Sequence, residues 1–235
     1  MEAAAGATKA DRTVTPDSRK ELRGKFITFE GIEGTGKTTQ IELLQKYLHS
    51  LGIQSVVTRE PGGTRLGERL RDLLLESAVV PVSDRTELLL MFSARAQHLE
   101  EVIYPALRLG TWVLSDRFTD ASYAYQGGGR GIPEAFIHQL ESLVHGGFEP
   151  DLTMLFTADL KTAMQRVSKR GDKDRFESEP VEFFERVQRV YLGLVENFPQ
   201  RFCVINAERR VEEVAAEIQQ CIQSRFQLSG SQGAS

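Results

Sequence analysis

Short apolar runs recur along the chain, and longer stretches with a helical pattern lie between them. Each run has about the length of a buried strand. The runs are Phe26–Phe29, Gln54–Val57, Trp112–Leu114, Leu152–Phe156 and Phe202–Ile205. After the first run, the isoleucine and leucines of "TTQIELLQKYLHSLG" recur at helical spacing, and Gly52 stands where a helix can end. Strands that alternate with helices predict a parallel sheet with right-handed crossovers.

We therefore expect residues 25–226 to form one doubly wound α/β domain, in which helices flank a five-stranded parallel sheet. A basic stretch at about residues 168–178 is predicted to be a mobile lid on this domain. Residues 1–24 have no hydrophobic signal core and are predicted to be a disordered N-terminal extension. Residues 227–235 are expected to be a flexible tail.

Composition limits the classes of molecule and the cellular environment that suit the chain. The chain has 235 residues and a formal net charge of −4, so it has no overall basic character for binding nucleic acid. No apolar run approaches the ~20 residues that a membrane-spanning helix needs. Two cysteines, Cys203 and Cys221, do not make a disulfide framework, and a cytoplasmic location in a reducing environment is predicted.

The stretch "FITFEGIEGTGKTTQ" contains a phosphate-binding loop, the P-loop. Its G-x-x-x-x-G-K-[ST] pattern lies between an apolar strand and an amphipathic helix, which is the context that the motif requires. Backbone N–H groups of such a loop surround phosphate oxygens, the lysine reaches the terminal phosphates, and the Thr38 hydroxyl binds Mg²⁺. The predicted phosphate-binding residues are Gly31, Ile32, Glu33, Gly34, Thr35, Gly36, Lys37, Thr38 and Thr39. The fold is thus predicted to be of the P-loop NTPase type.

Other motifs distinguish among proteins that bind nucleoside triphosphates. No N-K-x-D element for reading guanine is present, and the chain is short for a motor or AAA-type ATPase. Arg59 and Glu60 follow the second strand, and Asp116 and Arg117 follow the third. In an open α/β sheet these positions meet at the crevice beyond the strand ends. The arrangement favours a small-molecule kinase with its acceptor site beside the P-loop.

The chain resembles the bacterial thymidylate kinases over about residues 26–222. The resemblance rests on the motifs "FEGIEGTGKTTQ", "TREPGGT", "DRFTDASYAYQGGGRG" and "RGDKDRFE", in that order, of which the third is the most specific. It implies transfer of the γ-phosphoryl of ATP to thymidine 5′-monophosphate (dTMP), with Mg²⁺, by an enzyme that is usually a homodimer.

The resemblance also implies roles for acidic and basic residues near the P-loop. Glu33 is expected to point toward the 3′-hydroxyl of dTMP, because a carboxylate accepts well from a sugar hydroxyl and is a poor neighbour for phosphate. Arg59 and Arg117 are candidates for binding the acceptor phosphate, since a guanidinium can form two parallel bonds to it. Asp116 is expected to hold Mg²⁺ through water.

Recognition of the nucleoside is expected from two further segments. In "ELLLMFSARAQHL", Arg95 is expected to bond a thymine carbonyl and Phe92 to stack on the ring, while Met91 occupies the position at which the family usually has its aromatic residue. Ser122 and Gln126 are expected to contact the base edge. Tyr125 is expected to lie beneath the deoxyribose and to leave no room for a 2′-hydroxyl.

The last implied feature is a catalytic arginine in the lid. Some family members carry an arginine in the P-loop where this chain has Gly34. We expect the lid to supply that cation, through Arg170 or Arg175, with Arg170 favoured as the phosphate contact. Two alternatives stay open: another nucleotide or deoxynucleoside kinase of the same fold, and a nucleotide-binding regulatory module without catalysis.

Overall fold

A computed structural model of the chain describes residues 24–76, 81–169, 171 and 175–228. Its sheet has five parallel strands in the order β2-β3-β1-β4-β5. The strands are β1 (Phe26–Glu30), β2 (Ser55–Arg59), β3 (Trp112–Asp116), β4 (Leu152–Thr157) and β5 (Phe202–Asn206). All five predicted strands and the parallel α/β fold are confirmed, although each strand ends one or two residues later than the apolar run.

Helices connect the strands and cover both faces of the sheet. They are α1 (Lys37–Ser50), α2 (Arg65–Leu75), α3 (Asp84–His98), α4 (Tyr104–Arg108), α5 (Thr119–Ser122), α6 (Glu134–His145), α7 (Leu160–Lys169), α8 (Val181–Asn197) and α9 (Val211–Phe226), with π-helical turns η3 (Leu99–Ile103) and η4 (Tyr123–Gly129). Gly52 has φ +75°, so it follows α1 in the left-handed conformation expected at a helix end. No helix in the described ranges combines the length and apolar character needed to cross a bilayer.

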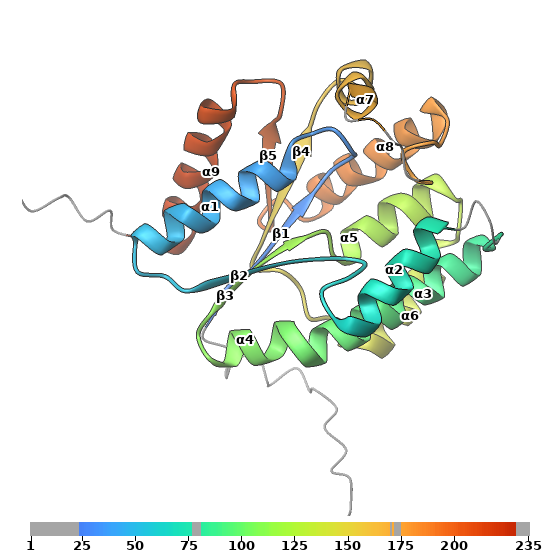
Figure 1. Cartoon of the computed structure of the whole chain (residues 1–235), viewed down its shortest axis with the longest axis horizontal. Coiled ribbons are helices and arrows are strands. Elements are labelled where there is room, and N and C mark those ends of the chain that lie inside the picture. Colours follow the sequence, from blue (N-terminus) through green and yellow to red (C-terminus); the bar gives the residue numbers. More distant parts are fainter. Residues whose placement is uncertain (1–23, 77–80, 170, 172–174, 229–235) are drawn as a thin grey trace, which may run out of the picture.

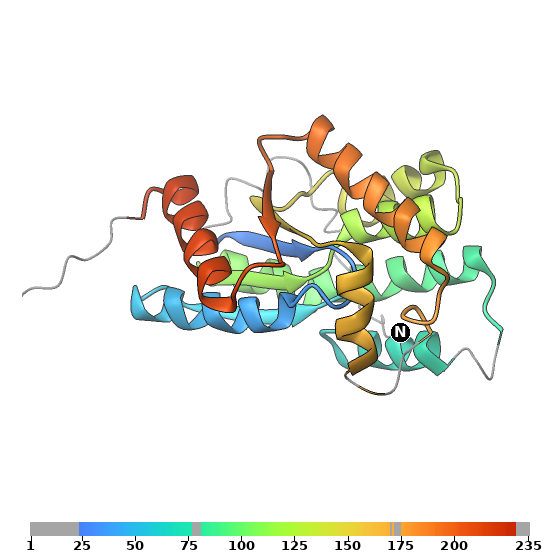
Figure 2. The same ribbon diagram turned by 90° about the horizontal axis from the view of Figure 1, so that it is seen from above.

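Strand β1 is buried on both faces because helices lie on either side of it (Figures 1 and 2). Alternate side chains of a strand point to opposite faces. Ile27 and Phe29 belong to the core that α1 and α9 form with the sheet. Phe26 points the other way and stacks on Phe148, with ring centroids 5.4 Å apart. This two-sided burial explains why the strands read as continuous apolar runs.

The parallel arrangement brings the charged strand ends together. In the sheet register Asp116 pairs with Phe29 of β1 on one side and with Arg59 of β2 on the other. The chain leaves β1 at Glu30 and enters the P-loop directly, so the loop lies at the same edge as these charges. The fold therefore places the phosphate-binding loop beside the carboxyl ends of β2 and β3.

Candidate active site

The P-loop has the backbone shape that its glycines predict. Gly31, Gly34 and Gly36 have φ values of +123°, +77° and +81°, which residues with a side chain rarely adopt. Helix α1 begins immediately afterwards at Lys37, so its positive N-terminal end faces the loop. The Lys37 ammonium donates to the carbonyl oxygens of Gly31 and Ile32, at 2.9 and 3.0 Å. Burial lowers the pKa of this lysine.

Gly34 is also required by packing. A Cβ atom at this position would lie 2.2 Å from the carbonyl oxygen of Ala163 in α7. Helix α7 therefore rests directly on the P-loop backbone, and a side chain at position 34 would push the two apart. The helix that leads into the predicted lid thus contacts the phosphate-binding loop.

A cavity that is partly open to solvent lies beside the P-loop. Six residues predicted from the sequence line it: Glu33, Arg95, Arg117, Ser122, Tyr125 and Gln126. Residues that the sequence analysis did not assign also line it, among them Glu60, Arg71, Met91 and Phe176. We call this the acceptor cavity.

Glu33 joins the P-loop to the acceptor cavity. Its carboxylate lies 2.6 Å from Nη2 of Arg117 and accepts from the Tyr125 hydroxyl at 2.8 Å. Burial holds the pKa of Tyr125 well above its usual range, so the hydroxyl stays protonated and can donate. Arg117 lies over the Tyr125 ring, with its guanidinium carbon 4.5 Å from the ring centroid. The three side chains thus form one polar group at the boundary between the two sites.

A second carboxylate, Glu30, lies behind Arg117. It accepts from the Phe118 backbone N–H and from the Tyr191 hydroxyl, both at 2.7 Å, and Tyr191 in turn accepts from Nη1 of Arg117 at 3.3 Å. Burial, reinforced by the charge of Asp120, raises the pKa of Glu30 to about 8. The raised pKa favours the protonated, uncharged form of this group behind Arg117.

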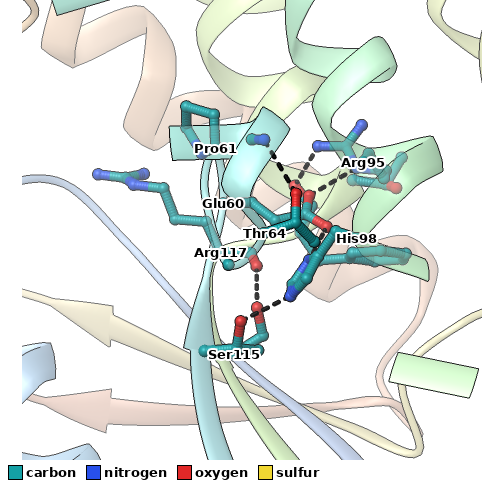
Figure 3. A network of polar contacts seen from close by, with 12 residues as sticks. Glu60, Pro61, Thr64, Arg95, His98, Ser115 and Arg117 are labelled. Carbon is teal, nitrogen blue, oxygen red and sulfur yellow. Dashed lines mark hydrogen bonds and ion pairs between the residues drawn. The ribbon is translucent and has the colours of Figure 1, made fainter. Parts of the chain in front are cut away.

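Arg95, which also lines the cavity, is held by a buried network of polar contacts (Figure 3). Its Nε donates to Glu60 at 2.7 Å, and its Nη2 donates to the Phe118 carbonyl and the Ser122 hydroxyl, both at 3.1 Å. Glu60 also contacts Nδ1 of His98 at 2.9 Å. Burial acts to raise the pKa of Glu60, but Arg95 and His98 hold it below its usual value, so the carboxylate stays ionised.

One nitrogen of Arg95 is left over in this network. Its Nη1 is buried and has no hydrogen-bond partner among the residues that the structure describes. A buried donor without a partner costs about 1–3 kcal/mol, which a ligand acceptor in the cavity would recover. The geometry therefore suits recognition of a carbonyl oxygen by Arg95.

Arg59 is not brought to the acceptor cavity. Its side chain is 53 % exposed and pairs with Glu68 at 2.7 Å, and it is absent from the cavity wall. The wall instead contains Arg71 of α2, whose Nη1 donates to the Pro61 carbonyl at 3.1 Å. Gly67 and Leu74 are the buried residues of α2, and Arg71 lies four residues after the first and three before the second. This helical spacing could have identified Arg71 as a residue on the inward face of the helix.

The predicted stacking residue is also placed differently. Phe92 is 2 % exposed and packs in the core with Leu88 and Ile137, whereas Met91 lines the cavity. Phe92 still contacts Arg95, because its ring lies under the guanidinium with a carbon-to-centroid distance of 4.5 Å. Met91 stands four residues before Arg95, and Phe92 stands three before it. The spacing of four places Met91 closer than Phe92 to the helix face that carries Arg95.

The predicted metal ligands meet the requirements of Mg²⁺. The hydroxyl-bearing Thr38 is exposed in the first turn of α1. Oδ1 of Asp116 is buried without a hydrogen-bond partner among the described residues, as expected of an acceptor kept for a metal-bound water. No cluster of three or more acidic, histidine or cysteine ligands occurs in the described ranges. Mg²⁺ that binds with a nucleotide needs only one or two protein groups, so the residues present fit it.

The predicted lid is described only in part. Arg170 lies outside the described residues, as do residues 172–174. Nη1 of Arg175 lies 2.9 Å from the buried carboxylate of Glu87 in α3. Arg175 is thus paired at the acceptor side of the molecule. Its neighbour Phe176 forms part of the cavity wall.

A P-loop whose carboxylate contacts an arginine in the wall of an adjacent acceptor cavity defines the class of this protein: it is a P-loop kinase. Residues 29–218 match the family model described as thymidylate kinase. The chain belongs to the thymidylate kinase family.

Individual relatives agree with this assignment. The chain is 52 % identical over 204 residues to a thymidylate kinase of Hahella chejuensis, covering 87 % of this chain and 98 % of that one. It is 48 % identical over 211 residues to a thymidylate kinase of Nitrosomonas eutropha, covering 90 % and 98 %. The crystal structure of thymidylate kinase from Ehrlichia chaffeensis superposes with a TM-score of 0.70 at 35 % identity, covering 85 % of this chain and 99 % of that chain.

Proposed function

We propose that this protein transfers the γ-phosphoryl group of ATP to dTMP, giving ADP and thymidine diphosphate for dTTP synthesis. The observation that carries this function is the position of the acceptor cavity, which meets the P-loop at Glu33 and Arg117. A phosphate oxygen of the acceptor can therefore face the terminal phosphate of a nucleotide bound in the loop. The bond between the γ-phosphorus and the β–γ bridging oxygen breaks as the new phosphorus–oxygen bond forms.

The donor is held by the P-loop. Residues 31–39 supply backbone N–H groups. The Lys37 ammonium, which donates to two loop carbonyls in this structure, donates to the β- and γ-phosphates when ATP is bound. The Thr38 hydroxyl and, through water, Asp116 would hold Mg²⁺, which would supply positive charge against the charge that develops on the phosphates. This role fits the partnerless buried oxygen of Asp116.

The acceptor is held by the opposite walls of the cavity. Arg117 binds the dTMP phosphate. Arg71 is the second arginine on this phosphate, a role that was predicted for Arg59. Glu33 accepts from the 3′-hydroxyl, and the Tyr125 ring excludes a 2′-hydroxyl. The free Nη1 of Arg95 reads a thymine carbonyl, which the burial of this nitrogen supports.

The remaining nucleoside contacts come from three residues. Ser122 and Gln126 line the base end of the cavity, and the Met91 side chain packs on the thymine ring in place of an aromatic residue. The Phe92 ring packs against the guanidinium of Arg95. Such contacts orient the acceptor for in-line attack, so catalysis rests on positioning and charge neutralisation, with no covalent enzyme intermediate. Because position 34 of the P-loop is a glycine and not an arginine, Arg170 of the lid supplies the cation for the transferred phosphoryl group.

Two further features complete the proposal. The chain forms a homodimer through α3 and α6, which pack on each other and leave the large apolar side chains of Leu89, Phe136 and Leu143 exposed at 53 %, 46 % and 81 %. It acts in the cytoplasm, where its two free cysteines would stay reduced.

A coupled assay of ADP formation against a panel of nucleoside monophosphates tests this function. We expect dTMP to give the highest kcat/KM. A nucleoside kinase would instead prefer thymidine, and a regulatory module would bind ATP without any dTMP-dependent release of ADP. Either result would refute the proposal.

A further inference from the structure

Arg117 has a backbone conformation that its surroundings must hold in place. Among the described residues, only Arg117 and Gln227 combine a side chain with a positive φ, and Gln227 stands at the end of α9, where such a conformation is common. Arg117 has φ +73° and directly follows β3. A residue with a side chain is strained in this region, and it stays there only where the contacts around it fix the backbone.

Three hydrogen bonds fix the backbone on either side of this residue. The Arg117 N–H donates to the carbonyl oxygen of Phe29 in β1 at 3.0 Å, and the Ser115 hydroxyl donates to the Arg117 carbonyl oxygen at 2.8 Å. The third bond uses a side chain of another strand, because Oε1 of Glu30, the last residue of β1, accepts from the Phe118 N–H at 2.7 Å. One carboxyl group thus helps to set the backbone path that carries Arg117 past the edge of the sheet.

The second oxygen of the same carboxyl group is linked to the Arg117 side chain. The Tyr191 hydroxyl donates to Oε2 of Glu30 at 2.7 Å and accepts from Nη1 of Arg117 at 3.3 Å. Glu30 and Tyr191 are 0 % and 1 % exposed, so neither contact competes with bulk water. One buried carboxyl group therefore holds both the backbone and the guanidinium of the same arginine.

The rest of the Arg117 guanidinium faces the reaction site. Its Nη2 donates to Glu33 at 2.6 Å and to the Tyr125 hydroxyl at 2.9 Å, at the boundary between the P-loop and the acceptor cavity. The Arg117 side chain keeps 16 % of its surface exposed and lines this cavity. Glu30 thus acts on the buried side of the arginine and leaves the side that faces the cavity to a ligand.

We propose that Glu30 is a positioning residue for phosphate binding in the acceptor cavity. Through Phe118 and Tyr191 it fixes the backbone and the guanidinium of Arg117 at the boundary with the P-loop before a ligand binds. A guanidinium that is positioned in advance loses less conformational freedom when it binds a phosphate, so the phosphate is bound more tightly. The inference rests on the proposed function, because it takes Arg117 as the residue that binds the dTMP phosphate.

Binding of dTMP and of thymidine tests this role, because the two ligands differ only in the 5′-phosphate. Isothermal titration of the full chain with each ligand gives the ratio of the two dissociation constants. In the unaltered protein we expect dTMP to bind at least about thirty-fold more tightly than thymidine, since hydrogen bonds to a charged group can each contribute roughly ten-fold or more in affinity.

Glu30→Leu removes both oxygens that hold Arg117. We expect the ratio of the two dissociation constants to fall by at least about ten-fold, through weaker binding of dTMP and not of thymidine. A purely structural role of Glu30 would lower thermal stability and weaken both ligands alike, which would leave the ratio unchanged.

Two further variants keep part of the arrangement. Glu30→Gln has an amide oxygen that can accept from the Phe118 N–H and an NH₂ group that can donate to the Tyr191 hydroxyl, so it should restore most of the ratio. Tyr191→Phe removes only the link to the guanidinium, and its ratio should fall by at least about three-fold. Tyr191→Phe also serves as the test if Glu30→Leu does not fold.

Thr28→Val is the matched control. Thr28 is also 0 % exposed and lies two residues before Glu30 in β1, so its side chain points to the same face of the sheet. Its hydroxyl bonds that of Thr153 at 3.0 Å. The variant removes one buried hydrogen bond without altering a contact of Arg117, so it should keep the ratio of the unaltered protein.

The outcomes separate this inference from the proposed function. An unchanged ratio in Glu30→Leu or in Tyr191→Phe would overturn the role of Glu30 alone, as would an equal loss in Thr28→Val or in Glu30→Gln. A ratio near unity in the unaltered protein would instead overturn the proposed acceptor, and the inference with it.

Discussion

The carboxylate of Glu33 lies 2.6 Å from the guanidinium of Arg117, and both side chains remain partly open to the acceptor cavity. This pair explains how a loop that attracts phosphate tolerates an acidic residue, because Arg117 and the Tyr125 hydroxyl compensate its charge. Arg117 has φ +73°, a strained conformation for a residue with a side chain and one that concentrates at functional sites. The strained backbone aims the arginine at the boundary between donor and acceptor.

The Tyr125 ring is expected to select deoxyribonucleotides. The kcat/KM for dTMP should greatly exceed that for ribothymidylate, and Tyr125→Ala should narrow the ratio by removing the steric block. Tyr125→Phe is the control: it keeps the ring and loses only the hydroxyl, which donates to Glu33 and accepts from Arg117, so discrimination should persist. Parallel assays with the two nucleotides measure the ratio, and equal turnover of both by the unaltered enzyme would refute the steric account.

Arg95 is expected to read the thymine edge. Its removal alone would leave Glu60 buried with less compensation, at a cost of about 3–5 kcal/mol in folding stability. The double variant Arg95→Met, Glu60→Gln removes both charges. Its KM for dTMP should rise by at least about ten-fold, because a hydrogen bond from a charged donor contributes about 1.5–3 kcal/mol. The KM for ATP should not change, and an unchanged KM for dTMP would leave Arg95 with a structural role only.

Glu30 is expected to make folding stability fall with pH. A carboxyl group whose pKa is near 4.5 in the unfolded chain and about 8 in the folded protein binds its proton more tightly when folded. Stability should therefore decline as pH rises from about 4.5 to about 8. Glu30→Gln should flatten the decline by on the order of a few kcal/mol, since one pKa unit is worth about 1.4 kcal/mol. Urea unfolding of both proteins at pH 5, 6, 7 and 8 measures the difference, and parallel curves would contradict it.

Contact between the P-loop and α7 is tested by Gly34→Ala. Both Gly34 and Gly52 have positive φ, at +77° and +75°, so alanine at either position costs about 1–2 kcal/mol of backbone strain. A Cβ at Gly52 meets open space, whereas one at Gly34 overlaps the Ala163 carbonyl. Gly34→Ala should therefore lose more unfolding free energy than Gly52→Ala and should also raise the KM for ATP. Equal losses in the two variants would contradict the contact.

The lid cation is tested at Arg170. An arginine that reaches the transferred phosphoryl group can be worth ~10³-fold or more in kcat. Arg170→Ala should lower kcat by at least about a hundred-fold with little change in the KM for dTMP, the pattern of an interaction made mainly in the transition state. Steady-state kinetics with both substrates gives the two constants. A kcat near that of the unaltered enzyme would exclude this residue as the lid cation.

Sequence pattern predicted the strands and the P-loop well, because burial on both faces and glycine-dependent backbone leave direct marks in the sequence. The acceptor side was harder to predict. A strand-end arginine such as Arg59 can turn to solvent and pair with Glu68, while a helix such as α2 supplies Arg71 from elsewhere. Met91 and Phe92 are about 100° apart around the axis of α3, so only one of them can face the cavity. The core contacts of Phe92 decide that Met91 is the one.

Buried partnerships had no signal in the sequence at all. The pairing of Glu60 with His98, and of Glu87 with Arg175, joins segments that only the folded chain brings together. In the sequence Glu87 reads as an ordinary surface charge, and Glu60 only as a charge at the end of a strand. Their burial shows that the acceptor cavity is held by a second layer of charges behind the residues that line it.

Phosphoryl transfer from ATP to dTMP is tested by a labelling experiment. The enzyme is incubated with ATP labelled with ³²P at the γ-position, Mg²⁺ and dTMP, and the products are separated by chromatography. We expect the label to appear in thymidine diphosphate, in amounts equal to the ADP formed. Label in inorganic phosphate, or ADP formed without labelled thymidine diphosphate, would contradict it.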